Sequence, residues 1–339
     1  MYKILIGARM NNTMRRTMLA LMAAVAIIGV TAFVVTQPGA SQPASAPYPD
    51  KPVKYIVPFA PGGESDIGAR FQQQVFRKKF NQELIIESKP GAGGALAWAQ
   101  TNSFPGDGYT LMSTNLPHIV LQPLEGQVQY KTEDLTNVYF YHYTPDAIIV
   151  RSESPYKTYQ DLVKAAKQKP GDITIAGSGT NSANHMATER FNGVAGIKTT
   201  YVPFKGTGDL VASLLGGHVN MAMSYVTLAI AQKGRTRMLA VATEKRHPQF
   251  PDVPTFRELG IDWVDGAYRG IAVPKSTPPE MRKKISDIFA EINKDPEFQK
   301  RMAEGGFELV DIPLEKVPAF MAERTKVYTQ AAKRMGLLH

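Results

Sequence analysis

Three short loops hold the residue types in this sequence that are best suited to chemistry. Each is rich in glycine together with serine or threonine, and each separates a segment that predicts a strand from one that predicts a helix: Pro61–Asp66, Gly177–Ser182 and Lys205–Asp209. Glycine lets a backbone approach a ligand closely, and the first turn of a helix offers unpaired N–H groups and a partial positive charge that suit a carboxylate or phosphate. One such loop is usually only a turn with a helix cap, but three in one chain favour an anion-binding crevice.

Enzyme chemistry finds less support in the same loops. Ser178 stands in Ala-Gly-Ser-Gly, which lacks the G-x-S-x-G spacing of a nucleophile elbow. None of the loops matches the nucleotide-binding patterns G-x-x-x-x-G-K-[ST] or G-x-G-x-x-G. His185 follows Ser178 by seven residues, and we interpret it as a histidine at a ligand rim or a domain surface. The sequence therefore predicts no catalytic residue.

Composition argues against a metal, a cofactor or a nucleic-acid partner. The sequence has no cysteine, and its six histidines form no H-x-x-x-H or H-E-x-x-H pair. The net charge is +9, but residues 1–46 carry four basic and no acidic residues, which leaves 35 basic against 30 acidic residues in the remainder. These basic residues are scattered, whereas nucleic-acid binding favours a concentrated basic patch or stripe. A small anion remains the ligand class that the loops favour.

The loops must be positioned by the strands and helices around them. Ile67, Phe71, Val75 and Phe80 recur at near-helical spacing, which predicts a helix over 66–80. The aromatic run 139–143 predicts a buried strand near a crossing between domains. Strands that alternate with helices indicate an α/β fold with mostly parallel sheets. Strands are predicted at 53–59, 84–87, 109–113, 147–150, 173–176, 199–204, 219–223 and 238–243, and further helices at 159–169, 183–192, 278–293, 296–304 and 315–335, with shorter ones ending at Trp98 and Gly216.

The N-terminus has the pattern of an export signal. Basic residues lie between Lys3 and Arg16, an uncharged and mostly apolar run follows over Met18–Val35, and Ala44–Ala46 offers an A-x-A cleavage site. The run is 18 residues long, which is just enough to cross a bilayer as a helix. We therefore predict a periplasmic protein with a signal peptide, and an uncleaved membrane anchor is the alternative.

The sequence resembles one known family along nearly its whole length. It is similar to the Bug family, the solute receptors of tripartite tricarboxylate transporters, and the similarity covers residues 48–339 in order. The motifs that carry it are Tyr48–Val53, Ile56–Asp66, Lys89–Gly94, Pro105–Leu111, Gly177–Thr180 with His185, Val202–Gly206, Leu214–Gly217, Pro251–Thr255 and Ala272–Pro278.

This resemblance implies a fold and a division into domains. The fold would be that of a two-lobed periplasmic binding protein of the type II-like class, an α/β fold in which each lobe is a mostly parallel sheet flanked by helices. The ligand cleft would lie between the lobes. Residues 1–47 would be the signal peptide or anchor with its linker, 48–147 and 246–339 would form lobe 1, and 148–245 would form lobe 2.

The resemblance also implies a set of ligand-binding residues. The first and second loops would face each other across the cleft and hold one carboxylate of the ligand, and more variable residues would read its other end. For the first carboxylate these are Gly63, Glu64, Ser65, Asp66, Ser178, Gly179 and Thr180, and for the second end they are Thr114, Asn115, Thr207, Ser224, Tyr225 and Arg269.

Two departures from the family pattern affect the expected ligand. Glu64 stands where many members carry a small residue, and its carboxylate would repel an anion unless it points away or pairs with Arg269 or with a cationic group of the ligand. Asn220 and Ser224 stand where amino-acid receptors tend to carry an aspartate, which argues against an α-amino acid. Dicarboxylates, aromatic acids and other acids with neutral tails remain. Arg269 has two interpretations, a bidentate partner of a second carboxylate or a member of an ion pair between lobes.

We therefore predict an extracytoplasmic receptor, and not an enzyme, that captures a small organic (di)carboxylate or aromatic acid. Its partner would be the membrane permease of a tripartite tricarboxylate-type transporter, with no cofactor, no metal and no nucleic acid, and the protein would be a monomer. One alternative is a sensor protein that presents the same ligand to a membrane histidine kinase. A second is an enzyme on the same fold, for which the sequence offers no assembled base–nucleophile pair.

Overall fold

The computed structural model describes residues 48–336 and 338. The predicted signal peptide, its cleavage site and most of the linker lie outside these residues. Within the described part, no helix is both long and apolar enough to cross a membrane.

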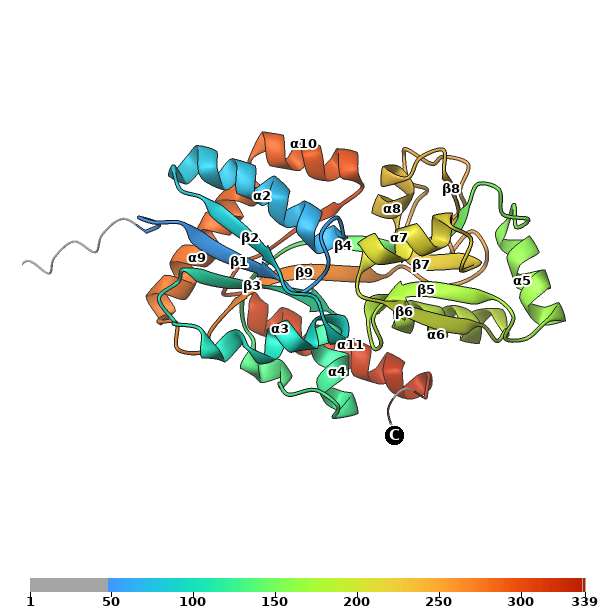
Figure 1. The fold of residues 1–339 in the computed structure, drawn as a ribbon, viewed down its shortest axis with the longest axis horizontal. Coiled ribbons are helices and arrows are strands. Elements are labelled where there is room, and N and C mark those ends of the chain that lie inside the picture. The colour runs from blue at the N-terminus through green and yellow to red at the C-terminus, as the bar shows by residue number, and fades with distance from the viewer. Residues whose placement is uncertain (1–47, 337, 339) are drawn as a thin grey trace, which may run out of the picture. The chain divides into compact units, whose positions relative to one another are not determined.

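A first sheet is built from both ends of the described chain (Figure 1). Strands β1 (Val53–Val57), β2 (Leu84–Ser88) and β3 (Thr110–Leu116) are parallel neighbours, and helix α2 (Glu64–Phe80) connects β1 to β2. β1 stops two residues earlier than predicted because Pro58 has no N–H with which to continue the ladder. β3 then pairs antiparallel with β9 (Gly266–Val273), which comes from the C-terminal third of the chain.

One long strand links this sheet to a second one. β4 (Thr136–Arg151) pairs with β9 from Thr136 to Pro145 and then, from Asp146 onward, with strands of the second sheet. All of these pairings are antiparallel, as is that of β4 with β10 (Glu308–Ile312). The predicted strand at 147–150 is thus the second half of a longer element, and the aromatic run 139–143 is its first half.

The second sheet repeats the parallel arrangement of the first. β5 (Thr174–Ser178) lies between β6 (Thr200–Phe204) and β7 (Met221–Tyr225) and is parallel to both, whereas β8 (Thr236–Val241) pairs antiparallel with β4. Parallel strands therefore occupy the outer part of each sheet and antiparallel pairs surround the strand that the sheets share. Four helices belong to this half of the chain: α5 (Tyr159–Gln168), α6 (Ala183–Ala195), α7 (Thr207–Leu215) and α8 (Val226–Ala231).

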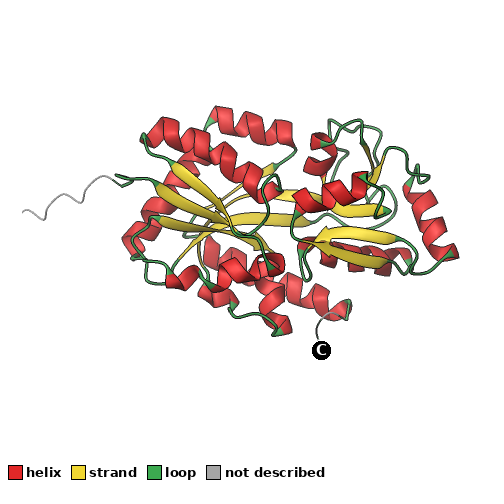
Figure 2. Cartoon of the chain, in the orientation of Figure 1, coloured by secondary structure: helices red, strands yellow, loops and turns green. Residues whose placement is uncertain are grey.

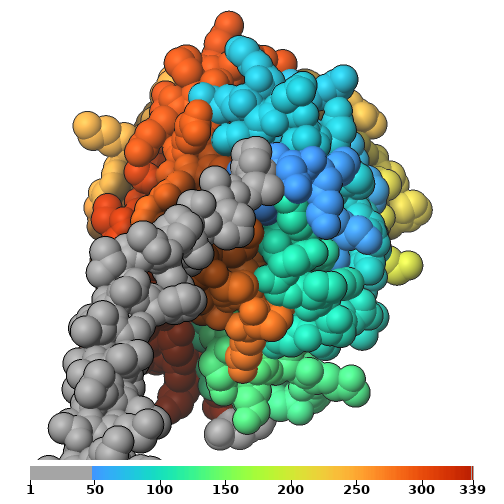
Figure 3. Space-filling view, turned by 90° about the vertical axis from the view of Figure 1, so that its left-hand side faces the viewer, coloured from blue at the N-terminus to red at the C-terminus, as the bar shows by residue number. Residues whose placement is uncertain are grey.

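The remaining helices cover the first sheet (Figure 2). Figure 3 shows N-terminal and C-terminal segments side by side on one face of the molecule. The two ends of the chain are also joined by an ion pair, because Lys79 of α2 lies 3.1 Å from Glu291 of α9 (Pro279–Asn293). The three C-terminal helices lie within two residues of their predicted bounds, whereas β9, β10 and α4 were not predicted. Together with α2, the helices that cover the first sheet are α3 (Ala95–Ala99), α4 (His118–Glu125), α9 (Pro279–Asn293), α10 (Pro296–Gly305) and α11 (Val317–Arg334). Short 3₁₀ turns lie at Ala92–Gly94, Thr101–Ser103 and Thr132–Asp134.

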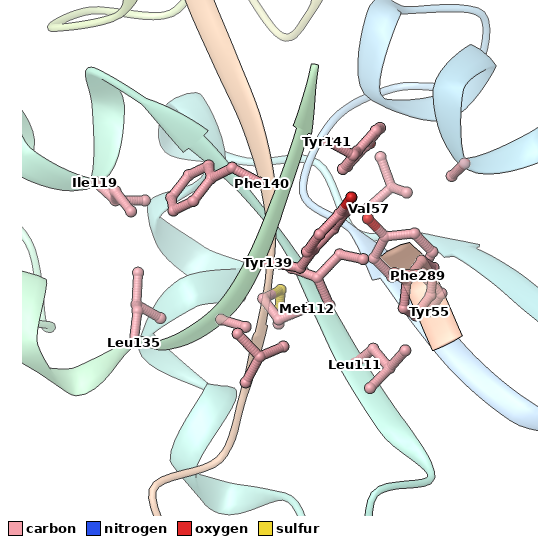
Figure 4. Close-up of a cluster of buried hydrophobic side chains, with 14 of the residues drawn as sticks. Tyr55, Val57, Leu111, Met112, Ile119, Leu135, Tyr139, Phe140, Tyr141 and Phe289 are labelled. Atoms are coloured by element: carbon pink, nitrogen blue, oxygen red, sulfur yellow. The ribbon is translucent and has the colours of Figure 1, made fainter. Parts of the chain in front are cut away.

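Aromatic side chains on β4 pack into the core on both faces of the first sheet. Figure 4 shows Tyr139 and Tyr141 on one side of the strand, near Tyr55 and Phe289, and Phe140 on the other. All five side chains are buried. Because side chains alternate across a strand, such a run is apolar on both faces and reads as a fully buried strand. This confirms the prediction of a buried strand made from the aromatic run.

Candidate ligand-binding site

The first and third predicted loops meet at a small pocket, together with the end of β5. The space between the side chains is about 10 Å³, which is about the room of one water molecule. Loops from the two halves of the chain are in close contact around this point. The pocket is lined by Phe59, Gly63, Glu64, Ser65, Asn115, His118, Ser178, Thr207 and Arg269.

The N-termini of two helices open toward this pocket without a side-chain cap. The N-cap residues of α2 and α7 are Gly63 and Gly206, and neither helix has a side-chain hydrogen bond at its cap. First-turn N–H groups have no partner within the helix and carry a partial positive charge. A carboxylate at this point would therefore find donors from both halves of the chain.

Glycine is required where the two loops touch. A Cβ atom on Gly208 would lie 2.8 Å from the carbonyl oxygen of Pro61, and one on Gly63 would lie 3.7 Å from the backbone nitrogen of Thr207. The first distance is shorter than real Cβ contacts, so a side chain at Gly208 would push the loops apart. The small residues in both sequence patterns thus serve the close approach of one half to the other.

A buried ion pair forms one wall of the pocket. Arg269 on β9 and Glu64 at the start of α2 are 2% and 4% exposed, and Arg269 Nη2 lies 3.5 Å from Glu64 Oε2. Thr144 donates a hydrogen bond of 2.6 Å to the same carboxylate oxygen. Burial raises the pKa of Glu64 to about 7, although the charge of Arg269 and the hydrogen bond from Thr144 both act to lower it. Of the three alternatives for Glu64, the structure shows pairing with Arg269.

The other donors of Arg269 hold the guanidinium in place. Nη1 donates to the carbonyl oxygen of Ala267 at 2.9 Å, and the guanidinium carbon lies 5.2 Å from the centre of the Tyr225 ring. With the Asn115 amide oxygen facing the pocket, that oxygen accepts from Arg269 Nε at 3.0 Å and from the Ser65 hydroxyl at 3.1 Å. Asn115 thus joins the arginine of β9 to the first turn of α2.

His118 at the start of α4 is a neutral member of the pocket. Its ring packs edge-on against Phe59 and Trp98, at centroid distances of 5.6 and 6.1 Å. Burial and the positive charge of Arg269 lower the pKa of His118 to about 3. Within the described residues, neither ring nitrogen has a hydrogen-bond partner. The imidazole therefore offers an uncharged donor or acceptor to whatever occupies the pocket.

The second loop is held by hydrogen bonds to side chains at the start of α6 and gives one residue to the pocket. The backbone N–H and the hydroxyl of Ser178 both donate to the Asn184 side chain, and the N–H of Asn181 donates to His185 Nδ1 at 3.1 Å. The Ser182 hydroxyl accepts from the His185 N–H and so caps α6. Ser178 lines the pocket, whereas Gly179 and Thr180 do not.

Gly179 has a packing role instead. A Cβ atom there would lie 2.8 Å from the Cα atom of Gly93, and its φ is +81°, so a side chain would be both crowded and strained. Thr180 is exposed. The second loop therefore touches the first half of the chain through the backbone of Gly179 and through a hydrogen bond from the Asn181 side chain to Glu125 of α4.

Four further predicted residues lie outside the pocket lining. Asp66 accepts from the Gly62 N–H and from Arg70 Nε, each at 2.9 Å, and Thr114 donates to Asn137 at 2.6 Å. Ser224 is fully buried, and Tyr225 lies under Arg269. These positions support the wall of the site.

Sequence reasoning missed Phe59 and His118. From the sequence alone, His118 is considered only for metal spacing and Phe59 is placed in a strand. The position of Phe59 directly before the first loop was the available signal, since side chains at the carboxyl end of a strand point into such sites. Within residues 48–336 and 338, no group of three or more histidine, aspartate or glutamate side chains is placed to hold a metal ion.

The sequence of this chain matches a known family and is similar to several of its members. Residues 68–337 match the sequence model described as the tripartite tricarboxylate transporter family receptor. The chain is 32% identical over 263 residues to the UPF0065 protein in the TAR-I ttuE-ttuC' intergenic region of Agrobacterium vitis, covering 76% of each. It is 28% identical over 318 residues to Protein BugT of Bordetella pertussis, covering 92% of this chain and 97% of BugT.

Solved structures of similar fold support the same family. The periplasmic binding protein BugD has a TM-score of 0.80 at 27% identity, covering 85% of this chain and 99% of BugD. The structure of Rpa4515 of R. palustris with adipate has a TM-score of 0.79 at 24% identity, covering 86% of this chain and 99% of Rpa4515. At this identity the likeness supports the fold alone. MatC of Rhodopseudomonas palustris with bound malate has a TM-score of 0.75 at 24% identity, covering 85% and 98%.

The structure has two sheets joined by β4 with a pocket between them, and the similar proteins point to the same fold. The fold is that of a two-lobed periplasmic binding protein, and the chain belongs to the tripartite tricarboxylate transporter receptor family.

Proposed function

We propose that this protein is an extracytoplasmic receptor that captures a small organic acid, a dicarboxylate or an aromatic acid, and delivers it to the permease of a tripartite tricarboxylate-type transporter. The observation that carries the proposal is the convergence of two uncapped helix N-termini, those of α2 and α7, beside the guanidinium of Arg269. Adipate and malate in two solved neighbours of the same fold support this choice of ligand class.

Binding would be coupled to a movement of two lobes. We assign residues 48–147 and 246–339 to one lobe and 148–245 to the other, with the hinge at the point where β4 passes from one sheet to the next. A space of about 10 Å³ is too small for a dicarboxylate, so the lobes must separate before the ligand enters. The closed form would then be the one that the permease recognises. The N-terminal segment would direct this protein, as a monomer, to the periplasm.

A receptor fits the pocket better than an enzyme does. The Ser178 hydroxyl donates to an asparagine and not to a base that could activate it. His118 has a pKa of about 3, far from the value that suits a general base near neutral pH. The polar groups of the pocket are thus suited to holding an acid and not to attacking one.

The direct test is a ligand screen on the purified protein. Thermal unfolding is measured against mono-, di- and tricarboxylates, aromatic acids and amino acids, and each hit is titrated by calorimetry. We expect one class of acid to stabilise the protein, by about 2.7 kcal/mol at a ligand concentration of 100 Kd. Stabilisation by α-amino acids alone would contradict the expected ligand class. If no acid shifts the transition, the receptor function itself is wrong.

A further inference from the structure

Glu64 places a carboxylate in a pocket that we propose receives the carboxylate of a ligand. Resting on that proposed function, we propose that Glu64 is the counter-ion of Arg269 while the receptor is empty and takes up one proton when an acid binds. Glu64 then determines the charge that the site accepts. The proton comes from the solvent and forms the O–H bond of a carboxylic acid on Glu64, and no other bond changes.

The contacts of Arg269 show which donor a ligand can take. Nε and Nη1 donate to Asn115 and Ala267 at 3.0 and 2.9 Å, within the ordinary range of N–H···O hydrogen bonds. Nη2 is 3.5 Å from Glu64 Oε2, longer than the roughly 2.7–2.9 Å of a charge-assisted hydrogen bond. The close partner of the Glu64 carboxylate is instead Thr144, at 2.6 Å. Nη2 is therefore the donor that is left for a ligand, and the ligand can approach it while the planar guanidinium stays in place.

Of the titratable groups around Glu64, Arg269 on β9 supplies the positive charge. Burial and Arg269 lower the pKa of His118 on α4 to about 3 and that of His142 on β4 well below its ordinary value, so both rings are neutral at pH 7. Burial, followed by the neighbouring Asp265, raises the pKa of Asp146 on β4 well above its usual range. Burial also raises the pKa values of two phenols, Tyr141 on β4 and Tyr225 at the end of β7.

The acidic neighbour on the same helix has its own partner. Asp66 pairs with Arg70, whose Nε lies 2.9 Å from its carboxylate, and it does not line the pocket. Above pH 7 the described side chains that line the pocket thus carry one positive charge, on Arg269, and one negative charge, on Glu64.

A ligand carboxylate would leave this buried site with an uncompensated negative charge. Burying an unpaired charge is strongly unfavourable, so a group in the site has to neutralise. Glu64 is the group best suited to do so, because burial has already brought its pKa to about 7 and a second anion beside it raises that pKa further. A dicarboxylate can then place one carboxylate at Arg269 and the other at the N-termini of α2 and α7.

Proton uptake gives binding a defined dependence on pH. Above pH 7 the empty receptor has an ionised Glu64 and the loaded receptor a protonated one, so the affinity falls by about tenfold for each pH unit. The carboxyl groups of adipate and malate are already ionised in this range and do not contribute. In Glu64→Gln, which resembles the protonated side chain, the affinity for the same acid stays constant between pH 7.5 and 9 and is higher than in the unsubstituted protein at pH 9.

Calorimetry counts the protons directly. We would titrate adipate, malate and the best acid of the thermal screen at pH 8.0 in Tris and in HEPES, whose ionisation enthalpies differ. The unsubstituted protein should take up close to one proton per acid, and Glu64→Gln none. Glu83→Gln is the matched control, since Glu83 pairs with Arg77 at 3.0 Å away from the pocket, and it should behave like the unsubstituted protein.

A second variant covers the case in which Glu64→Gln does not fold. Thr144→Val removes the hydrogen bond that lowers the pKa of Glu64, so Glu64 ionises at higher pH and binding at pH 8.0 becomes tighter with less proton uptake. Binding of an acid without proton uptake, or with equal uptake in Glu64→Gln, overturns this inference and leaves the receptor function standing. If no acid binds to either protein, both proposals fail.

Discussion

The loop before α2 and the loop before α6 have similar compositions, but their polar groups are used differently. At α2, the cap residue Gly63 has no side chain to offer, and the helix N-terminus opens to the pocket. At α6, the Ser182 hydroxyl accepts from the N–H of His185 at 3.1 Å. The side chains of Asn184 and His185 then accept from the N–H groups of Ser178 and Asn181.

The difference shows how a helix N-terminus is kept for a ligand. At α6 one N–H group of the first turn and two of the preceding loop are already bonded to nearby side chains, so fewer donors are left for an anion. The loop before α6 thus contributes Ser178 alone to the pocket lining, whereas the first loop and the start of α2 contribute Gly63, Glu64 and Ser65. Glycine and hydroxyl content is the same signal in both loops, and the side chains one turn further on decide between the two roles.

The largest effect should come from filling the pocket through its single residue from the loop before α6. Ser178→Leu places a larger side chain in a space of about 10 Å³, so we expect acid affinity to fall by about 3 kcal/mol or more, roughly 100-fold. Thr180→Leu is the matched control in the same loop, because Thr180 is exposed and outside the lining, and its affinity should change by less than about threefold. Calorimetry measures both. Equal losses would mean that the whole loop contacts the ligand.

A smaller effect should follow from separating the loops before α2 and α7. In Gly208→Ala the new Cβ would lie 2.8 Å from the Pro61 carbonyl oxygen, so the closed form is disfavoured. We expect a loss of affinity of about 1–2 kcal/mol, roughly five- to thirtyfold, with a native thermal transition in the absence of ligand. Gly193→Ala, at an exposed helical position with no atom within 4 Å, is the control and should keep full affinity. Unchanged affinity in Gly208→Ala would contradict the need for this close approach.

Much of this architecture could be predicted from local patterns. The helical spacing of Ile67, Phe71 and Val75 gave the position of α2, and the family motifs gave the two-lobed fold. The antiparallel pairing of β4 with β9 could not be read in this way, because it joins segments more than one hundred residues apart in the sequence. Sheet pairing depends on long-range contacts that no local pattern contains.

The candidate site shows the same difference between what the sequence predicts and what depends on long-range contacts. Residues on the first loop and Arg269 were named from the family resemblance, but their partners could not be. Whether Glu64 turns to Arg269 or away, and whether Ser182 caps α6, depends on three-dimensional neighbours such as Thr144 and Asn115. His118 was missed because its role comes from burial beside Phe59 and not from its spacing to other histidines.

The smallest expected effects come from one substitution at the capped N-terminus of α6 and one at the uncapped N-terminus of α7. The first should lower stability without changing affinity, and the second should lower affinity without changing stability. Ser182→Ala removes the cap of α6, and loss of such a cap costs about 1 kcal/mol of unfolding free energy. Because Ser182 does not line the pocket, acid affinity should stay within about twofold. Thr207→Ala, in the first turn of α7, should do the opposite. Thr207 lines the pocket but its helix has no side-chain cap to lose, so stability should change by less than about 0.5 kcal/mol.

Affinity for the acid should nevertheless fall several-fold in Thr207→Ala. Chemical denaturation and calorimetry on both variants give the four values needed. If Ser182→Ala loses affinity as strongly as Thr207→Ala, the self-bonded loop before α6 takes part in binding, and the distinction between the two kinds of helix N-terminus is wrong. A loss of stability without a loss of affinity in Ser182→Ala would show that an internally capped helix serves only to hold Ser178 against the open N-termini of α2 and α7.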